Sequence, residues 1–263
     1  MRMLIFILSL LLPQYLGAQK LLWERAIPTA RLFDVDDINN CYIVFEDNSL
    51  VKYNEHGDST THYRSIQHGP IASITARNPL KILLFYPDFS KLIILDRMLS
   101  VKTEIDLRRS GMMRASAAAL SQDGQIWVLD EQIMRLFKID EQGKTIMQSE
   151  DIRTLTRSHT EIQAIQEQNR RLYLIDESLG LYIFDQFANF LHSVQLPEQH
   201  QAQALEQGIL YQQQGKLQLY QEVNGQTREL PLTLEPDFIT ARVNKERLYI
   251  LYPNKLVVYS LMP

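Results

Sequence analysis

The stretch LSQDGQIWVLDEQIMRLFKIDEQGKT, residues 120–145, contains the pattern that decides the fold. It holds two short apolar runs, Ile126–Leu129 and Met134–Ile139, with the polar turn DEQ between them. Runs of about four to six residues rich in Ile, Val, Tyr and Phe are typical of β-strands, and the stretch shows no sustained helical period. The stretch therefore predicts a β-hairpin. Because both runs are continuously apolar, we expect both faces of the hairpin to be covered.

The same hairpin pattern recurs along the chain. The first apolar runs begin at Tyr42, Ile82, Ile126, Leu172, Ile209 and Leu248, which are 40, 44, 46, 37 and 39 residues apart. Each is followed by a second apolar run and, in most units, by a more polar third one. A short run of small residues, for example Ala115–Leu120, precedes the hairpin. Four antiparallel strands every ~40 residues is the spacing of a β-propeller blade.

The number of units predicts how the ring closes. The 245 residues after residue 18 give about 41 per unit for six units. The last unit, Phe238–Tyr259, supplies only three strands, and Leu21–Ala26 is a spare strand without a blade. We predict an all-β, six-bladed β-propeller closed by the N-terminal strand, with residues 19–263 as a single domain, because this closure hides exposed strand edges. An open or seven-bladed arrangement is the alternative, and a β-helix fits the repeat length less well.

One unit resembles a known kind of blade. In residues 120–145, Asp123, Gly124, Ile126, Trp127, Asp140 and Gly143 match the DG turn, apolar strand and strand-ending Asp of NHL-type or sensor-type propeller repeats. Weaker matches occur at Leu50–Asp58 and Leu181–Asn189. The leader, the tyrosine content and the LLFYPDF stretch are also similar to secreted propellers of the Bacteroidota type. This resemblance implies the fold but no particular activity, because such propellers serve unrelated functions.

Residues 1–18, MRMLIFILSLLLPQYLGA, read as a secretory signal peptide cleaved after Ala18. One charge precedes an apolar stretch that Pro13 ends, and small residues follow. A membrane anchor is the alternative, but about ten apolar residues are too few to cross ~30 Å of hydrocarbon. We therefore expect an exported protein, periplasmic, outer-membrane associated or secreted, with no transmembrane segment after cleavage.

Composition and motifs exclude several functions. The net charge of −4 and pI near 5.9 do not favour nucleic-acid binding. Cys41 is the single cysteine, which excludes an intramolecular disulfide, and we interpret it as a buried hydrophobic residue. The sequence has no HExxH, no G-x-S-x-G and no phosphate-binding loop. We assign no catalytic residue, metal ligand or cofactor, and an enzyme is the less favoured class.

The acid-rich segment DVDDINN, residues 34–40, leaves one catalytic alternative open. A metal-dependent hydrolase or lyase of the propeller lactonase kind would hold its metal in the central channel with carboxylates. The candidates for such a site are Asp34, Asp36, Asp37, Glu161 and Asp237. The competing interpretation is a solvated turn between the first two strands of blade one.

The longer connections predict a binding face. In a propeller, the fourth-to-first and second-to-third connections emerge on one common face. The basic residues of these connections are Arg108, Arg109, Arg114, Arg153 and Arg157. They predict a patch for an acidic partner segment or a carboxylate ligand, with scattered solvated charge as the alternative. Tyr86 and Phe89 flank the turn Pro87–Asp88 on the same face and are predicted contact anchors, although Phe89 could instead fold back as a plug.

Together these features favour a non-catalytic secreted propeller. We predict that it binds a protein partner in the cell envelope and acts as a scaffold or accessory subunit of an export or surface-attachment assembly. The alternatives are the metal-dependent enzyme and a small-ligand sensor. The sequence does not fix the partner's identity or the oligomeric state.

Overall fold

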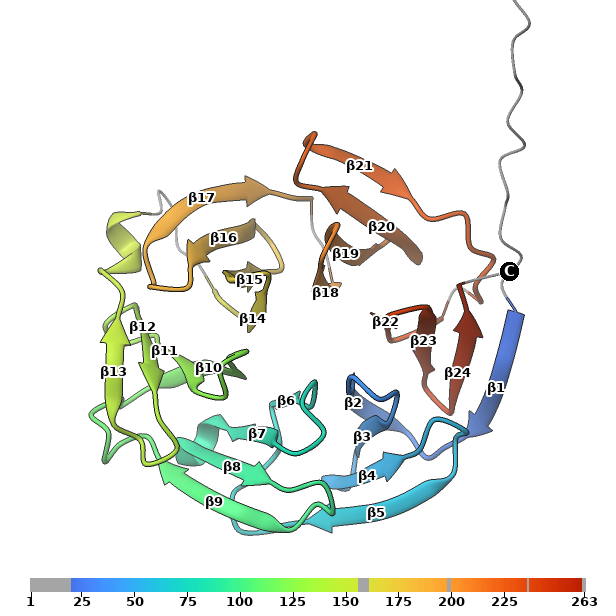
Figure 1. Ribbon diagram of the computed structural model, residues 1–263, viewed down its shortest axis with the longest axis horizontal. Coiled ribbons are helices and arrows are strands. Elements are labelled where there is room, and N and C mark those ends of the chain that lie inside the picture. The colour runs from blue at the N-terminus through green and yellow to red at the C-terminus, as the bar shows by residue number, and fades with distance from the viewer. Residues whose placement is uncertain (1–19, 156–160, 198–199, 236, 262–263) are drawn as a thin grey trace, which may run out of the picture.

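Six four-stranded antiparallel sheets form a closed ring around a central channel (Figure 1). The computed structural model describes residues 20–155, 161–197, 200–235 and 237–261. The observed architecture confirms the predicted all-β, six-bladed β-propeller. The signal peptide and Arg157 lie outside the described residues, so the signal peptide stays a prediction.

Blades one to three follow the chain from the channel outward. Blade one consists of β2 (Ala30–Val35), β3 (Cys41–Phe45), β4 (Ser49–Tyr53) and β5 (Ser59–Arg64). Blade two consists of β6 (Ser73–Thr75), β7 (Ile82–Tyr86), β8 (Lys91–Leu95) and β9 (Val101–Asp106). Blade three consists of β10 (Ala115–Leu120), β11 (Ile126–Asp130), β12 (Arg135–Ile139) and β13 (Thr145–Gln148). Short 3-10 helices occur at η1 (Pro87–Phe89) and η2 (Ile152–Thr154).

Blades four and five repeat this order, and blade six differs in its outermost strand. Blade four consists of β14 (Ala164–Gln168), β15 (Arg171–Asp176), β16 (Gly180–Asp185) and β17 (Phe190–Gln195). Blade five consists of β18 (His200–Leu205), β19 (Gly208–Gln213), β20 (Lys216–Gln221) and β21 (Gln226–Glu229). Blade six consists of β22 (Thr240–Asn244), β23 (Arg247–Tyr252), β24 (Lys255–Ser260) and, outermost, β1 (Lys20–Ala26).

The N-terminal strand closes the ring as predicted. Strand β1 pairs antiparallel with β24, with Leu21 opposite Tyr259 and Arg25 opposite Leu256. The Trp23 indole also donates a hydrogen bond of 2.8 Å to the Glu55 carbonyl, which ties β1 to blade one. The first and last parts of the propeller are therefore joined both within a sheet and between blades.

The core lies between neighbouring blades. Six clusters of buried side chains occupy the six blade junctions of the described chain. At the junction of blades three and four, Trp127 packs with Leu172 and Phe184, and all three are fully buried. Small residues of the innermost strand make room for the large ones, since Ala119 lies opposite Trp127 in the register of β10 and β11. Covering on both faces explains why the middle strands are continuously apolar rather than alternating.

A recurring turn explains the strand-ending Asp of the repeat. Between the third and fourth strands of the first four blades, one carboxylate or amide oxygen accepts the backbone N–H groups two and four residues further on. The accepting residues are Asn54, Asp96, Asp140 and Asp185. These side chains stabilise turns, so the Asp that recurs at this position is a structural feature of the blade.

The strand order defines two faces. We call the face with the fourth-to-first and second-to-third connections the loop face, and the other the opposite face. Strand β22 begins at Thr240, two residues after Phe238, where the last unit is predicted to begin. Strand β14 ends at Gln168, so Glu167 and Gln168 belong to an innermost strand that lines the channel. No helix in the described part of the chain is long and apolar enough to cross a membrane.

Candidate functional site

The arginines predicted to form a basic patch are paired with acids on the loop face. Within the described residues the pairs are Arg108 Nε with Asp106 Oδ1 at 3.7 Å, Arg109 Nε with Asp106 Oδ2 at 4.0 Å, Arg114 with Glu131, and Arg153 Nη2 with Asp151 Oδ2 at 2.5 Å. The hydrogen bond from Arg153 holds the pKa of the Asp151 carboxyl below its usual range. The positive charge of these four arginines is therefore largely offset by three acids, with Arg108 and Arg109 sharing Asp106.

The two aromatic anchors differ from each other. Tyr86 does not fit the predicted role, because its side chain is 0% exposed and belongs to the core between blades one and two. It is the last residue of β7, and its side chain points into the sheet packing rather than toward the turn. Phe89 is 43% exposed, with its ring beside Gly69 and in edge contact with His68 at 6.4 Å between centroids. Phe89 thus leans on the neighbouring loop and still offers a surface.

Exposed apolar side chains, which the sequence did not single out, accompany Phe89 on the loop face. Ile66 is 88% exposed, Met113 is 59% exposed and Ile133 is 40% exposed. We call Ile66, Phe89, Met113 and Ile133 the apolar band. The topology puts all four on this face, in connections or turns of blades one to three.

Hydrogen bonds join three of the segments that carry the apolar band. Arg108 Nη2 donates to the Phe89 carbonyl at 2.8 Å. The Glu131 backbone N–H donates to the Arg114 carbonyl at 2.9 Å, and Arg153 Nη2 donates to the Ile133 carbonyl at 3.4 Å. The Arg108 and Arg153 side chains therefore hold neighbouring loops together, and the Ile66 loop meets these segments through the ring contact between His68 and Phe89.

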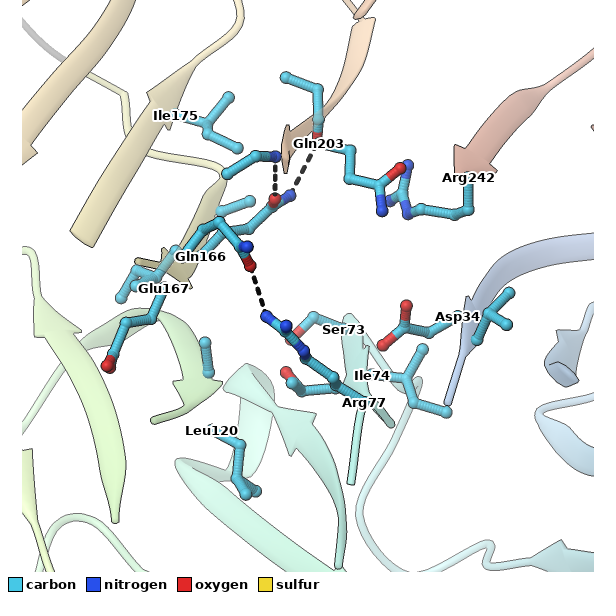
Figure 2. Close-up of a pocket in the computed structure, with 18 of the residues that line it drawn as sticks. Asp34, Ser73, Ile74, Arg77, Leu120, Gln166, Glu167, Ile175, Gln203 and Arg242 are labelled. Carbon is cyan, nitrogen blue, oxygen red and sulfur yellow. Dashed lines mark hydrogen bonds between the residues drawn. The ribbon is translucent and has the colours of Figure 1, made fainter. Parts of the chain in front are cut away.

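The central channel is the other candidate site (Figure 2). It forms a cavity of about 930 Å³, lined by residues from all six innermost strands and from the turns that follow them. This volume is near the upper end of small-molecule pockets, which range over roughly 300–1,000 Å³. The alanine-rich strand β10 lies across the ring from β22, and β14 lies across from β2 (Figure 1).

Glutamine side chains connect neighbouring innermost strands. Gln166 Nε2 donates to the Ala202 carbonyl at 2.7 Å, and its Oε1 accepts from the Ala204 N–H at 2.7 Å. Gln203 bonds the Val243 carbonyl and N–H in the same way, both at 2.8 Å. Each side-chain amide thus bonds the backbone of the next innermost strand as a neighbouring peptide group would. Gln166 and Gln203 therefore have a structural role between blades.

Asp34 and Arg242 bring opposite charges into the channel from the neighbouring strands β2 and β22. Figure 2 shows both side chains directed into the cavity. Each keeps some exposure because it faces the hollow, while protein surrounds it on the other sides. Burial raises the pKa of the Asp34 carboxyl, although Arg242 offsets part of that rise. Burial lowers the pKa of the Arg242 guanidinium.

A second set of charges lies at the channel mouth on the opposite face. Arg77 Nε is 3.4 Å from Asp37 Oδ1, and Arg77 Nη1 donates to Gln168 Oε1 at 2.5 Å across the mouth. Lys245 Nζ donates to the Asp37 carbonyl at 2.7 Å. These groups satisfy one another and link blades one, two, four and six.

The acids predicted as metal ligands do not come together. Asp34 and Asp37 line the channel, whereas Glu161 and Asp237 are not part of its lining. Asp36 is fully buried in a turn, where it accepts hydrogen bonds from Asn40 at 2.6 Å and from the Tyr42 hydroxyl at 2.9 Å. No group of three or more potential metal ligands occurs in the described part of the chain. DVDDINN therefore forms the predicted turn between the first two strands of blade one, but Asp36 within it is buried and not solvated.

Glu167 is a channel-lining acid that no sequence motif identifies. Its Oε2 accepts hydrogen bonds from Ser121 Oγ at 2.6 Å and from the Trp127 indole at 2.7 Å. It ties blade four to blade three at the edge of the channel. The SQDG segment, residues 121–124, is accordingly part of a structural turn whose serine supports the neighbouring blade.

The chain matches no family model and no curated protein sequence. It is similar in structure to virginiamycin B lyase from Staphylococcus aureus, with 14% identity and a TM-score of 0.61 over 91% of this chain and 99% of that one. BamB from Moraxella catarrhalis gives 10% identity and a TM-score of 0.56 over 93% and 98%. The Neurospora crassa Pan2 WD40 domain gives 10% identity and a TM-score of 0.59 over 92% and 95%.

These likenesses establish the propeller fold and nothing finer. The similar structures include a lyase, BamB and a WD40 domain, so the fold is compatible with catalysis and with binding. The NHL-type or sensor-type resemblance has no family match behind it. Function has to be argued from the sites themselves.

Proposed function

We propose that this chain is a non-catalytic propeller that binds a partner protein through the apolar band on its loop face. In this proposal it is an exported scaffold or accessory subunit of a cell-envelope assembly, of the export or surface-attachment kind. The observation that carries the proposal is the apolar band itself: four exposed apolar side chains on connected loops of one face.

The surroundings of the apolar band match the anatomy of a protein interface. Interfaces combine a few apolar or aromatic anchors with a polar rim, and contiguous exposed apolar surface on a soluble protein commonly marks an interaction site. Here the arginine–acid pairs around Arg108, Arg114 and Arg153 would form the rim. Because those charges are balanced, we expect the partner to be recognised chiefly by apolar contact, not by an acidic segment.

Capture from the native envelope tests the proposal. Ile66→Glu and Met113→Glu each place a charge in the apolar band, and both side chains are exposed, so folding should be unaffected. Leu80→Glu and Met98→Glu are matched controls on the opposite face, at residues 63% and 56% exposed. We expect a specific partner to be lost with the band variants and kept with the controls. Equal capture by all four variants would contradict the proposed face.

Export needs its own test. Fractionation of cells that express the full chain, with sequencing of the mature N-terminus, should find the protein outside the cytoplasm and beginning at Gln19. Retention of residues 1–18 on a cytoplasmic protein would remove the envelope part of the proposal and leave the binding face to be tested separately.

A further inference from the structure

Asp34 and Arg242 lie on neighbouring strands of the channel but do not pair with each other. No ion pair of 4.0 Å or less joins them, and each uses only part of its side chain in the described structure. Asp34 Oδ2 accepts the Ala76 N–H at 2.7 Å, and the Val35 backbone N–H also stabilises the carboxylate, so its hydrogen bonds come from backbone groups and not from a cationic side chain.

Arg242 is held by one end of its guanidinium. Nη1 donates to the Gln201 and Ala241 carbonyls at 3.1 and 3.0 Å and to Thr240 Oγ1 at 3.2 Å. In the described part of the chain, Nε and Nη2 of Arg242 have no hydrogen-bond partner. The anchored nitrogen fixes the orientation of the planar group, which leaves donors available to an anion in the cavity.

Both groups have neutral partners, including the Phe33 ring 5.9 Å from Arg242 Cζ, but charges withdrawn from bulk water without an ion pair are costly to a fold. The direction of the pKa changes at both groups reflects that cost. Elsewhere on the molecule the same residue types are paired, as Arg77 is with Asp37 and Arg153 with Asp151. An acid and a guanidinium kept apart on one wall of a cavity are arranged to receive a ligand that carries both opposite charges.

The lining across the channel is mixed. Leu120 of β10 and Ala164 of β14 are partly exposed there, beside the polar residues Gln166 and Glu167. Leu120 is labelled on this side of the cavity in Figure 2, away from Asp34 and Arg242. The cavity therefore offers an apolar contact at Leu120 in addition to the two charges.

We propose that the channel binds an α-amino acid with an apolar side chain. Its ammonium group would bond the Asp34 carboxylate, its carboxylate would bond the unused donors of Arg242, and its side chain would pack against Leu120. Ammonium and carboxylate groups on one carbon match two protein charges that are near each other but separated. This site goes beyond the proposed function, because none of its residues belongs to the loop-face apolar band.

Titration calorimetry on the unaltered protein provides the first test. L-leucine is the probe, and N-acetyl-leucine and leucinamide each remove one of its two charges. We expect leucine to bind and each blocked analogue to bind at least about tenfold more weakly, since truncation of a charge-assisted contact in a recessed site costs that much or more. No binding of leucine, or equal binding of N-acetyl-leucine, would overturn the proposal, the latter because it would indicate a simple anion site.

Variants supply the second test. Asp34→Asn should weaken leucine binding and abolish the preference for leucine over N-acetyl-leucine, whereas Arg242→Gln should abolish the preference over leucinamide. Lys245→Gln at the channel mouth is the matched control and should bind leucine as the unaltered protein does. Circular dichroism verifies folding of each variant. If a channel variant fails to fold, the analogue series on the unaltered protein still decides the question. Undiminished binding in a folded Asp34→Asn protein would overturn the proposal.

Discussion

Arginines and acids form ion pairs on the loop face, whereas Asp34 and Arg242 in the channel do not pair with each other. On the loop face, arginines such as Arg153 have acids within bonding distance, so the charges are satisfied locally and the apolar side chains are what remains exposed. In the channel, Asp34 and Arg242 remain apart on neighbouring strands. A paired charge stabilises loops, whereas the recessed charges of Asp34 and Arg242, which form no ion pair with each other, are the basis for the ligand proposed above. The number of charged residues in a region is therefore a poorer guide to binding than the state of their pairing.

The largest expected effect concerns the junction that supports both regions. Trp127 is fully buried between blades three and four, and its indole donates to Glu167 at the edge of the channel. Trp127→Ala should lower the free energy of unfolding by about 3–5 kcal/mol, because it removes a large buried aromatic side chain. Chemical denaturation measures the change.

Trp127→Phe separates packing from the hydrogen bond at the same position. It keeps most of the apolar volume and leaves Glu167 Oε2 with the Ser121 hydroxyl alone, so a smaller loss of about 1–2 kcal/mol is expected. Equal losses for the two substitutions would mean that the hydrogen bond, not packing, dominates this junction.

The next effect is specific to the channel wall. Gln203→Ala removes both hydrogen bonds to Val243 and should cost about 1 kcal/mol, since water in the channel can replace part of what is lost. Gln207→Ala, in the exposed turn after β18, is the matched control and should leave the free energy of unfolding within about 0.5 kcal/mol of wild type. If Gln203→Ala behaved like this control, the amide bridges between blades would have no role in stability.

The sequence predicted the ring well and the channel poorly, for a physical reason. Middle strands such as Ile82–Tyr86 are covered on both faces, so a run of consecutive apolar residues is enough to predict them. The channel is assembled from single residues of strands far apart in the chain, and no local pattern connects Asp34 with Arg242. Asp34 was selected only as one acid of a supposed metal site. For the same reason the sequence placed Tyr86 by its neighbouring turn and missed the direction of its side chain.

A pair of neutralising substitutions contrasts the two regions directly. Burial raises the pKa of Asp34, so the folded state favours the protonated carboxyl, and its stabilising effect is lost as the pH rises through that elevated pKa. Asp34→Asn mimics the neutral form and should raise Tm at pH 7, with a difference that disappears at pH values below the usual carboxyl pKa. Asp151 has the reverse sign, because the hydrogen bond from Arg153 lowers its pKa.

Asp151→Asn should accordingly lower Tm slightly at pH 7, and that difference should also fade as the pH falls through the lowered pKa of Asp151. Thermal unfolding of both variants and wild type between pH 3 and 7 (a span of about four units that covers the usual carboxyl pKa) measures both trends. A lower Tm for Asp34→Asn at pH 7 would mean that the ionised Asp34 carboxylate stabilises the folded state, contrary to this prediction.

The smallest effect on stability belongs to the loop-face arginines. Reversal of Arg108, Arg109 and Arg153 to Glu should change the free energy of unfolding by no more than about 1 kcal/mol, because all three side chains are largely exposed and surface ion pairs contribute little. The triple reversal also makes the rim of the apolar band strongly acidic, so partner capture should weaken while Tm hardly moves. Arg109→Glu alone, at a side chain 89% exposed, is the milder control. Unchanged capture by a folded triple variant would place the partner contact away from blades two and three, and the charge balance of the loop face would then serve only to order its loops.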